Sequence, residues 1–259
     1  MSVVAGVDVG SLMSKAAILM DDNIFYSLVP STVSSEKSGL AAFQQALEKA
    51  GVHDRDVEFV VATGYGRISA PYADAKVTEI TCHARGAYFL NPNVRTVLDI
   101  GGQDCKAIRV GEDGSVTDFV MNDKCAAGTG RFLEVLARIF EVGLDQLGDF
   151  CLKAEQKVPI SSTCTVFAES EIISLMAQGE KAENVIAGVH HSLARRAGSL
   201  LHRLRVEEQI AFTGGVGKNI GMRRSLEEII CKPITPLIGD PQLVGALGAA
   251  LIAKERSER

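Results

Sequence analysis

The chain has 259 residues, of which 46% are hydrophobic and 23% charged, and its formal net charge is −5. This composition favours a globular protein with a sizeable core over a disordered chain. The acidic balance gives no support for a nucleic-acid partner. No apolar run approaches the ~20 residues of a membrane span, and the first residues, MSVVAGVDVG, lack the basic start of a signal peptide. We therefore expect a cytoplasmic protein that makes no contact with a membrane.

The first part of the chain predicts three antiparallel strands, in the segments VVAGVDVG, SKAAILM and IFYSLVP. A helix is expected over 39–50, with Ser38 as its N-cap and Gly51 as its C-cap. A buried strand, VEFVVAT, follows, and then a helix over 78–90 that ends at Asn91-Pro92.

The same three-strand pattern begins again at Arg95, in TVLDIGG, CKAIRV and SVTDFVM, and places Asp99 91 positions after Asp8. Such a repeat indicates a duplicated fold with two lobes, 1–94 and 95–259. After it we expect a strand-like stretch in KVPISSTCTVF and helices over 168–178, 182–204 and 219–230. The last helix, within 243–259, is expected to pack back on the first lobe.

Two glycine-containing turns of the repeat have the chemistry of phosphate loops. In the first, Asp8 can hold a hydrated Mg²⁺, and the turn at Gly10 presents amides, the Ser11 hydroxyl and the Lys15 ammonium to phosphates. The second turn supplies more amides and carboxylates, and a glutamine that can orient a water: Asp99, Gly101, Gly102, Gln103 and Asp104. One such turn alone reads as a simple β-turn, but the pair describes a nucleotide held between two hairpins.

A third glycine loop follows the strand QIAFTGGVG, and its spacing does not match a dinucleotide loop. We interpret it as an adenosine loop formed by Gly214, Gly215 and Val216, with Asn219 capping the next helix. With all three loops, the chain resembles the α/β actin-like ATPase fold shared by actin, heat-shock chaperones and sugar or acetate kinases. The fold is a duplicated one, with a nucleotide cleft between its lobes.

Two of the six cysteines, Cys125 and Cys164, directly precede predicted helices, where helix amides favour the thiolate. Because no C-x-x-C pair occurs, a metal site must take ligands from distant segments or from two chains. Two thiolates are half of the set that a [4Fe–4S] cluster needs, which points to a homodimer sharing one cluster. Two buried thiols, or a zinc site shared with His190 or His191, remain alternatives. We also assign Gly128 and Gly130, in the turn after Cys125, to the nucleotide site.

Six segments together resemble the activators of 2-hydroxyacyl-CoA dehydratases: NDKCAAGTGRF, ISSTCTVFAESE, LDIGGQD, TGYGR, TCHARG and PQLVGALGAAL. The resemblance implies a homodimer with one [4Fe–4S] cluster between subunits, held by Cys125 and Cys164. It implies that hydrolysis of ATP to ADP, with Mg²⁺, drives an electron into a partner dehydratase, and that ferredoxin or flavodoxin supplies the electron. Leu12 departs from the family, which usually has a hydroxyl residue there; Ser11 and Ser14 are the candidates to replace that phosphate contact.

In this hypothesis Asp8, Gln103 and Asp104 are the catalytic candidates, with Gln103 or Asp104 setting up the attacking water. An aryl-CoA reductase of the benzoyl-CoA type is an alternative partner. A small-molecule kinase and a non-enzymatic nucleotide switch of the same fold are the rival functions. The matched cysteines favour neither rival.

Overall fold

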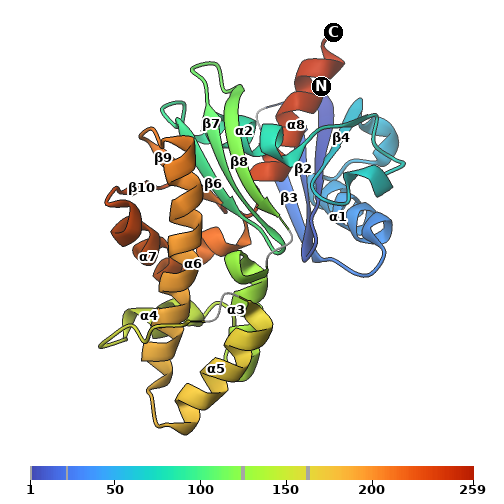
Figure 1. Ribbon diagram of the computed structural model, residues 1–259. Helices are drawn as coiled ribbons and strands as arrows, with labels where there is room; N and C mark the ends of the chain where they lie inside the picture. Colours follow the sequence, from blue (N-terminus) through green and yellow to red (C-terminus); the bar gives the residue numbers. More distant parts are fainter. Residues whose placement is uncertain (1, 22, 124–125, 162–163) are drawn as a thin grey trace.

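The computed structural model describes residues 2–21, 23–123, 126–161 and 164–259. Among these residues, no helix combines the length and the apolar character that a membrane crossing needs. The described chain folds into two five-stranded sheets with helices packed on their faces (Figure 1).

The first sheet has the strand order β3-β2-β1-β4-β5. Its strands are β1 (Val3–Val9), β2 (Met13–Met20), β3 (Asn23–Pro30), β4 (Phe59–Thr63) and β5 (Ala75–Lys76). β1, β2 and β3 are antiparallel neighbours, whereas β4 runs parallel to β1 and β5 parallel to β4. The predicted meander is therefore correct.

The second sheet repeats this topology, with the order β10-β9-β6-β7-β8. Its strands are β6 (Thr96–Ile100), β7 (Asp104–Val110), β8 (Val116–Asp123), β9 (Ile210–Thr213) and β10 (Ile234–Thr235). β6, β7 and β8 are antiparallel, β9 is parallel to β6, and β10 is parallel to β9. The two sheets are thus the two halves of a duplicated actin-like fold, as the repeat predicted.

Eight α-helices occur in the described residues. They are α1 (Ser35–Ala50), α2 (Glu79–Leu90), α3 (Gly130–Ile139), α4 (Leu147–Leu152), α5 (Thr165–Ala177), α6 (Ala182–Leu204), α7 (Ile220–Ile230) and α8 (Val244–Ser257). α1 covers one face of the first sheet and α8 the other. In the second sheet, α6 packs on one face and α2 on the other. α2 and α8 therefore lie between the two sheets (Figure 1).

Strand alternation decides which way the strand-end carboxylates face. In β1, Val3, Ala5 and Val7 pack toward α1, whereas Val4 packs toward α8. Because successive side chains of a strand point to opposite faces, Asp8 shares the face of Val4. In β6, Asp99 shares the face of Val97, which packs with α2. Both aspartates are therefore directed to the space between the sheets.

Two local expectations were wrong. The first helix begins at Ser35, because the hydroxyl of Ser34, not that of Ser38, accepts the capping hydrogen bond from the Lys37 amide. The segment 157–167 contains no strand in its described residues, and α5 begins at Thr165 with Cys164 as its N-cap. β-Branched residues gave this segment a strand-like pattern, but no neighbouring strand pairs with the described residues there.

Candidate functional site

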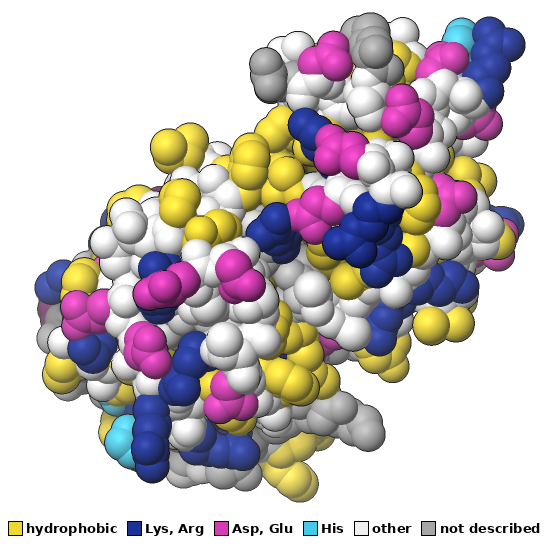
Figure 2. All heavy atoms as spheres, turned by 90° about the horizontal axis from the view of Figure 1, so that it is seen from above, with side chains coloured by type: hydrophobic (Ala, Val, Ile, Leu, Met, Phe, Trp, Pro, Cys, Tyr) yellow, Lys and Arg dark blue, Asp and Glu magenta, His cyan; other side chains and the backbone are white. Residues whose placement is uncertain are grey.

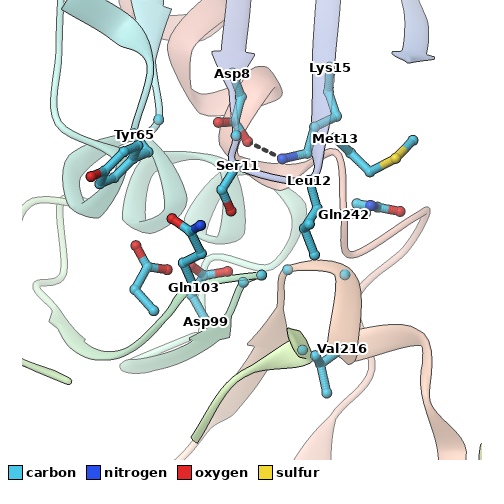
Figure 3. Close-up of a pocket in the computed structure, with 18 of the residues that line it drawn as sticks. Asp8, Ser11, Leu12, Met13, Lys15, Tyr65, Asp99, Gln103, Val216 and Gln242 are labelled. Atoms are coloured by element: carbon cyan, nitrogen blue, oxygen red, sulfur yellow. Dashed lines mark hydrogen bonds and ion pairs between the residues drawn. The ribbon is translucent and has the colours of Figure 1, made fainter. Parts of the chain in front are cut away.

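A cavity of about 510 Å³ lies between the two sheets (Figure 3). It brings together most of the residues that the sequence assigned to nucleotide binding and catalysis. They are Asp8, Gly10, Ser11, Leu12, Lys15, Asp99, Gly101, Gly102, Gln103, Asp104, Gly130, Gly214, Gly215, Val216 and Asn219. All three predicted glycine loops thus face one cavity, although they are far apart in the sequence.

The two β-hairpins present the same pair of side chains to this cavity. In the first sheet Asp8 lies opposite Lys15 in the β1–β2 register, and the Lys15 Nζ is 2.6 Å from the Asp8 Oδ2. In the second sheet Asp99 lies opposite Lys106 in the β6–β7 register, and the Lys106 Nζ is 3.4 Å from the Asp99 Oδ2. Asp8 and Asp99 are only 4% and 3% exposed. The duplication therefore brings two buried aspartate–lysine pairs to one cavity.

Lys106, which the sequence analysis did not assign to the site, contacts the predicted Asp99 and Asp104 and the unpredicted Glu79. Its Nζ is 2.7 Å from the Asp104 Oδ1 and 3.9 Å from the Glu79 Oε1, in addition to its contact with Asp99. Burial opposes the charge of Lys106, but Asp99 and Asp104 outweigh that effect and raise its pKa. Burial raises the pKa of Asp104. The spacing from Asp99 to Lys106 equals that from Asp8 to Lys15, so the repeat itself carried the signal for Lys106.

His83 of α2 is a second residue that the sequence analysis did not assign to the site. Its Nδ1 is 3.0 Å from the Thr213 Oγ1 and 3.6 Å from the Asp99 Oδ1. A Cβ added at Gly245 would lie 2.8 Å from the His83 Nε2 and 3.1 Å from the Asp8 Oδ2. The imidazole therefore lies between the two strand-end aspartates. Burial would raise the pKa of Asp99, but the charges of His83, Lys106 and Lys15 hold it below its usual value.

A glycine with positive φ stands beside each of these aspartates. Gly64 follows β4 with φ +85°, and Gly214 follows β9 with φ +83°. A Cβ would meet the Asp8 Oδ1 at 2.3 Å in the first case and the Asp99 Oδ1 at 2.6 Å in the second. Only glycine suits both the conformation and the space. Gly64 was missed, although the Thr-Gly pair at 63–64 repeats the one at 213–214.

Two predicted binding residues do not line the cavity. Ser14 is fully buried, and its hydroxyl lies 3.2 Å from that of Ser31. Since Lys15 points into the cavity, alternation along β2 turns Ser14 to the opposite face. Ser14 therefore does not replace a phosphate contact at Leu12. Gly128, in the short 3₁₀ turn Ala126–Gly128, lies beside Asn122 and Arg196.

The third loop is held in place by hydrogen bonds at the start of α7. Asn219 is the N-cap, and its Oδ1 accepts from the Met222 amide at 2.8 Å, as the sequence predicted for a cap. The Asn219 Oδ1 also lies 3.2 Å from the Nε2 of the buried His190, whose Nδ1 is 2.8 Å from the Ile186 carbonyl oxygen. Burial lowers the pKa of His190, and these two hydrogen bonds only partly oppose the shift.

The buried His190 predicts a loss of stability in mild acid. A histidine whose pKa is lowered by folding contributes stability that is present above its unfolded pKa of about 6.5 and is lost below it. We therefore expect the urea midpoint of the wild type to fall between pH 8 and pH 5.5 more steeply than that of His190→Gln. The exposed His53 gives the control, since His53→Gln should follow the wild-type curve. Parallel curves for wild type and His190→Gln would contradict the prediction.

Of the two predicted cluster cysteines, the structure describes only Cys164. Cys164 is exposed at the N-terminus of α5 and does not line the cavity. Cys125 lies outside the described residues. In the described part of the chain, no group of three or more His, Cys, Asp or Glu side chains is arranged to hold a metal ion. Cys82 and Cys105 are buried, and burial raises the pKa of the Cys82 thiol to about 12.

The second phosphate loop is hydrogen-bonded to the start of α3, the helix that follows Cys125 in the chain. The Gly130 amide donates to the Gly101 carbonyl at 2.8 Å, and the Arg131 amide to the Gly102 carbonyl at 3.2 Å. The Thr129 hydroxyl also donates to the Gly102 carbonyl, at 3.0 Å. Three hydrogen bonds therefore tie this loop to the start of α3.

Acidic and basic side chains are interspersed on the face of the molecule seen in Figure 2.

Sequence relatives match this chain over nearly its full length. Among named relatives, the chain is 48% identical over 258 residues to an activator of lactoyl-CoA dehydratase from Anaerotignum propionicum, covering 98% of each chain. It is 46% identical to the (R)-2-hydroxyglutaryl-CoA dehydratase activating ATPase of Acidaminococcus fermentans, again over 98% of each. One of the benzoyl-CoA reductase polypeptides of Thauera aromatica is 32% identical, over 100% of this chain and 95% of that one.

Solved structures agree with these relatives. The activator of 2-hydroxyisocaproyl-CoA dehydratase from Clostridium difficile, with bound ADPNP, has a TM-score of 0.93 at 42% identity and covers 99% of this chain and 96% of that chain. Component A of the A. fermentans (R)-2-hydroxyglutaryl-CoA dehydratase also gives 0.93, at 45% identity and full coverage of both chains.

The duplicated sheets and the phosphate loops around one cavity define the chain as a nucleotide-binding ATPase with an actin-like fold. Residues 5–253 match the BadF/BadG/BcrA/BcrD ATPase family, and the chain belongs to that family.

Proposed function

We propose that this chain is the ATP-dependent activator of a 2-hydroxyacyl-CoA dehydratase. In this role it transfers a low-potential electron from a [4Fe–4S] cluster, shared by two copies of the chain, to the dehydratase. The observation that carries the proposal is the exposed Cys164 at a helix N-terminus, in a chain that also has a complete phosphate-binding cavity. A kinase or a nucleotide switch of this fold has no use for such a thiol.

The cavity supplies what Mg·ATP binding requires. Asp8 and Asp99 are buried carboxylates that line the cavity, one from each sheet, and Mg²⁺ is usually bound through one or two carboxylates together with substrate phosphates. The glycine loops offer backbone amides, and Lys15 adds a cation. Ser11 and Gln103 face each other from the two loops (Figure 3), where a water near the γ-phosphate can be oriented. Mg²⁺ would neutralise charge that develops on the transferred phosphoryl group.

The cysteine chemistry fits a cluster shared between two chains. The Cys164 thiol is exposed at the N-terminus of α5, so a second copy of the chain can approach it. Two ligands from each chain, Cys125 and Cys164, complete the usual Cys₄ set. A [4Fe–4S] cluster bound there supplies one electron at low potential. The homodimer follows from this ligand count and from two-fold symmetry.

The link between nucleotide and cluster runs through the hydrogen bonds at the start of α3. Gly101 and Gly102 accept from Gly130 and Arg131, and Cys125 precedes Gly130 by five residues. A nucleotide that binds one arrangement of the phosphate loops more tightly than another shifts the equilibrium between them. The start of α3, the helix that follows Cys125 in the chain, would then shift with the loop. Ferredoxin or flavodoxin in the cytoplasm is the proposed electron donor.

Iron analysis of the anaerobically purified protein tests the proposal. We expect about four iron and four sulfide per dimer in the wild type, and loss of both in Cys125→Ala and Cys164→Ser. Cys231→Ser is the matched control, because Cys231 is also exposed but lies at the end of α7. Its iron content should equal that of the wild type. An unchanged iron content in Cys125→Ala would refute the shared cluster.

A further inference from the structure

Leu12 joins the two phosphate loops by an apolar contact across the cavity. It lies between β1 and β2, and its carbonyl accepts from the Ser31 amide at 2.8 Å, which holds the backbone in place. A Cβ added at Gly102, in the opposite loop, would lie 2.5 Å from both the Cγ and the Cδ1 of Leu12. Figure 3 shows the Leu12 side chain directed away from the Asp8–Lys15 pair and toward the loops of the second sheet. The isobutyl group therefore packs on the bare backbone of Gly102.

Polar side chains lie next to this contact in both loops. Ser11 directly precedes Leu12, and its Oγ would lie 2.9 Å from the same added Cβ. Gln103 directly follows Gly102 in the sequence. Leu12 cannot donate a hydrogen bond to phosphate or hold a water in place. Instead, its contact with Gly102 removes apolar surface from water, which favours approach of the two loops whether or not nucleotide is present.

We propose that Leu12 is a rate-limiting wedge that excludes water from the γ-phosphate side of the cavity and so slows hydrolysis in the absence of a partner protein. In hydrolysis, a water oxygen forms a bond to the γ-phosphorus while the bond to the β–γ bridging oxygen breaks, giving ADP, phosphate and a proton. The water must stand in line with the bond that breaks. An apolar group between the loops disfavours that water.

The advantage of slow hydrolysis to the protein rests on the proposed function, whereas the measurement of the hydrolysis rate does not depend on it. An ATPase that drives electron transfer wastes nucleotide whenever it turns over without its partner. A wedge that must shift before water is admitted ties hydrolysis to the loop movement that a docked partner would favour. Leu12 thus sets how fast ATP is hydrolysed without electron transfer to a partner.

Phosphate release by the purified protein alone, with Mg·ATP, tests the wedge. We expect Leu12→Ala and Leu12→Thr both to raise kcat, by roughly ten-fold, or about 1.4 kcal/mol of barrier. Leu152→Ala is the matched control, because Leu152 is exposed and does not line the cavity, and it should stay at the wild-type rate. If Leu12→Ala is no faster than wild type, the proposal is wrong even when Leu12→Thr is faster, because a new hydroxyl would then explain the gain.

A double-mutant cycle with Gly102 tests the contact independently of the rate argument. In the wild-type background, Gly102→Ala places a methyl group against Leu12 and should change the KM for ATP. In the Leu12→Ala background most of that obstruction is gone, so the same substitution should have a smaller effect. Equal effects in both backgrounds would show that the two loops do not touch in solution, and would overturn the proposal.

Failure of the wedge and failure of the proposed function are distinguishable. The rate and KM measurements need only the ATPase, whereas the iron and sulfide analysis needs only the cysteines. If the variants have the expected rates but the protein binds no iron, the proposal for Leu12 stands and the proposed electron transfer is wrong. If the rates are unchanged but the protein contains iron, the proposal for Leu12 is wrong and the proposed electron transfer stands.

Discussion

Asp8→Asn should lower the kcat of ATP hydrolysis by about 10²-fold or more, the scale on which single groups that stabilise transition-state charge act. Asp8 is a buried carboxylate at the end of β1, and the substitution removes its negative charge from the lining of the cavity. Without that charge, the proposed Mg²⁺ would be held less firmly, and Lys15 loses its 2.6 Å partner. Phosphate release at saturating Mg·ATP measures the effect.

The exposed Asp113, in the turn between β7 and β8, gives a matched control for the loss of one carboxylate. Its Oδ1 accepts from the Ser115 amide at 3.0 Å and it does not line the cavity, so Asp113→Asn should keep the wild-type kcat. Binding of ADP without magnesium by Asp8→Asn would show that the cavity is intact. An Asp8→Asn protein with wild-type kcat would remove Asp8 from the proposed magnesium site.

The internal repeat explains why so much of the fold was predictable from this sequence. Asp8 and Asp99 end equivalent strands, and the turns directly after these strands, 10–12 and 101–103, have the same length, so two phosphate loops could be matched before either was seen in space. The same comparison could have found Lys106 and Gly64, because each has a counterpart at an equivalent position, Lys15 and Gly214. These residues were missed because the repeat was read only through its aspartates and strands.

His83 and Ser14 show where the sequence carried too little information. His83 belongs to α2, and its partner Thr213 is 130 residues away, so only the packing of α2 between the sheets brings them together. Ser14 has the right chemistry for a phosphate contact but the wrong parity on β2. A loop assignment by residue type cannot separate these cases, whereas strand alternation, once the register is known, can.

The position of Leu12 illustrates a third limit. A leucine in a phosphate loop looks from the sequence like a lost hydrogen bond, which predicts a weaker site. The structure shows an added contact instead, since Leu12 packs on Gly102 of the opposite loop. Whether a substitution removes or adds an interaction depends on what lies across the cavity, and the local sequence does not contain that information.

Lys106→Met should destabilise the protein by about 3–5 kcal/mol, the cost of removing one partner from a buried ion pair. The side chain of Lys106 is 2% exposed and its Nζ faces Asp99, Asp104 and Glu79. Methionine fills a similar volume, so the loss comes from carboxylates left without their cation and not from a cavity. Urea unfolding followed by circular dichroism measures the change in the free energy of unfolding. In thermal unfolding, we expect Tm to fall by roughly 10 °C.

The comparison with Lys218→Met separates buried charge from charge in general. Lys218 also forms an ion pair, with its Nζ 2.5 Å from the Asp240 Oδ2, but its side chain is 46% exposed. Exposed pairs contribute little, so this variant should unfold close to the wild-type midpoint. Adding Asp99→Asn to Lys106→Met should restore part of the lost stability, because it removes one of the unpaired carboxylates. If Lys106→Met is as stable as the wild type, Asp99 and Asp104 are not both charged in the folded protein, and the buried charge cluster around Lys106 is contradicted.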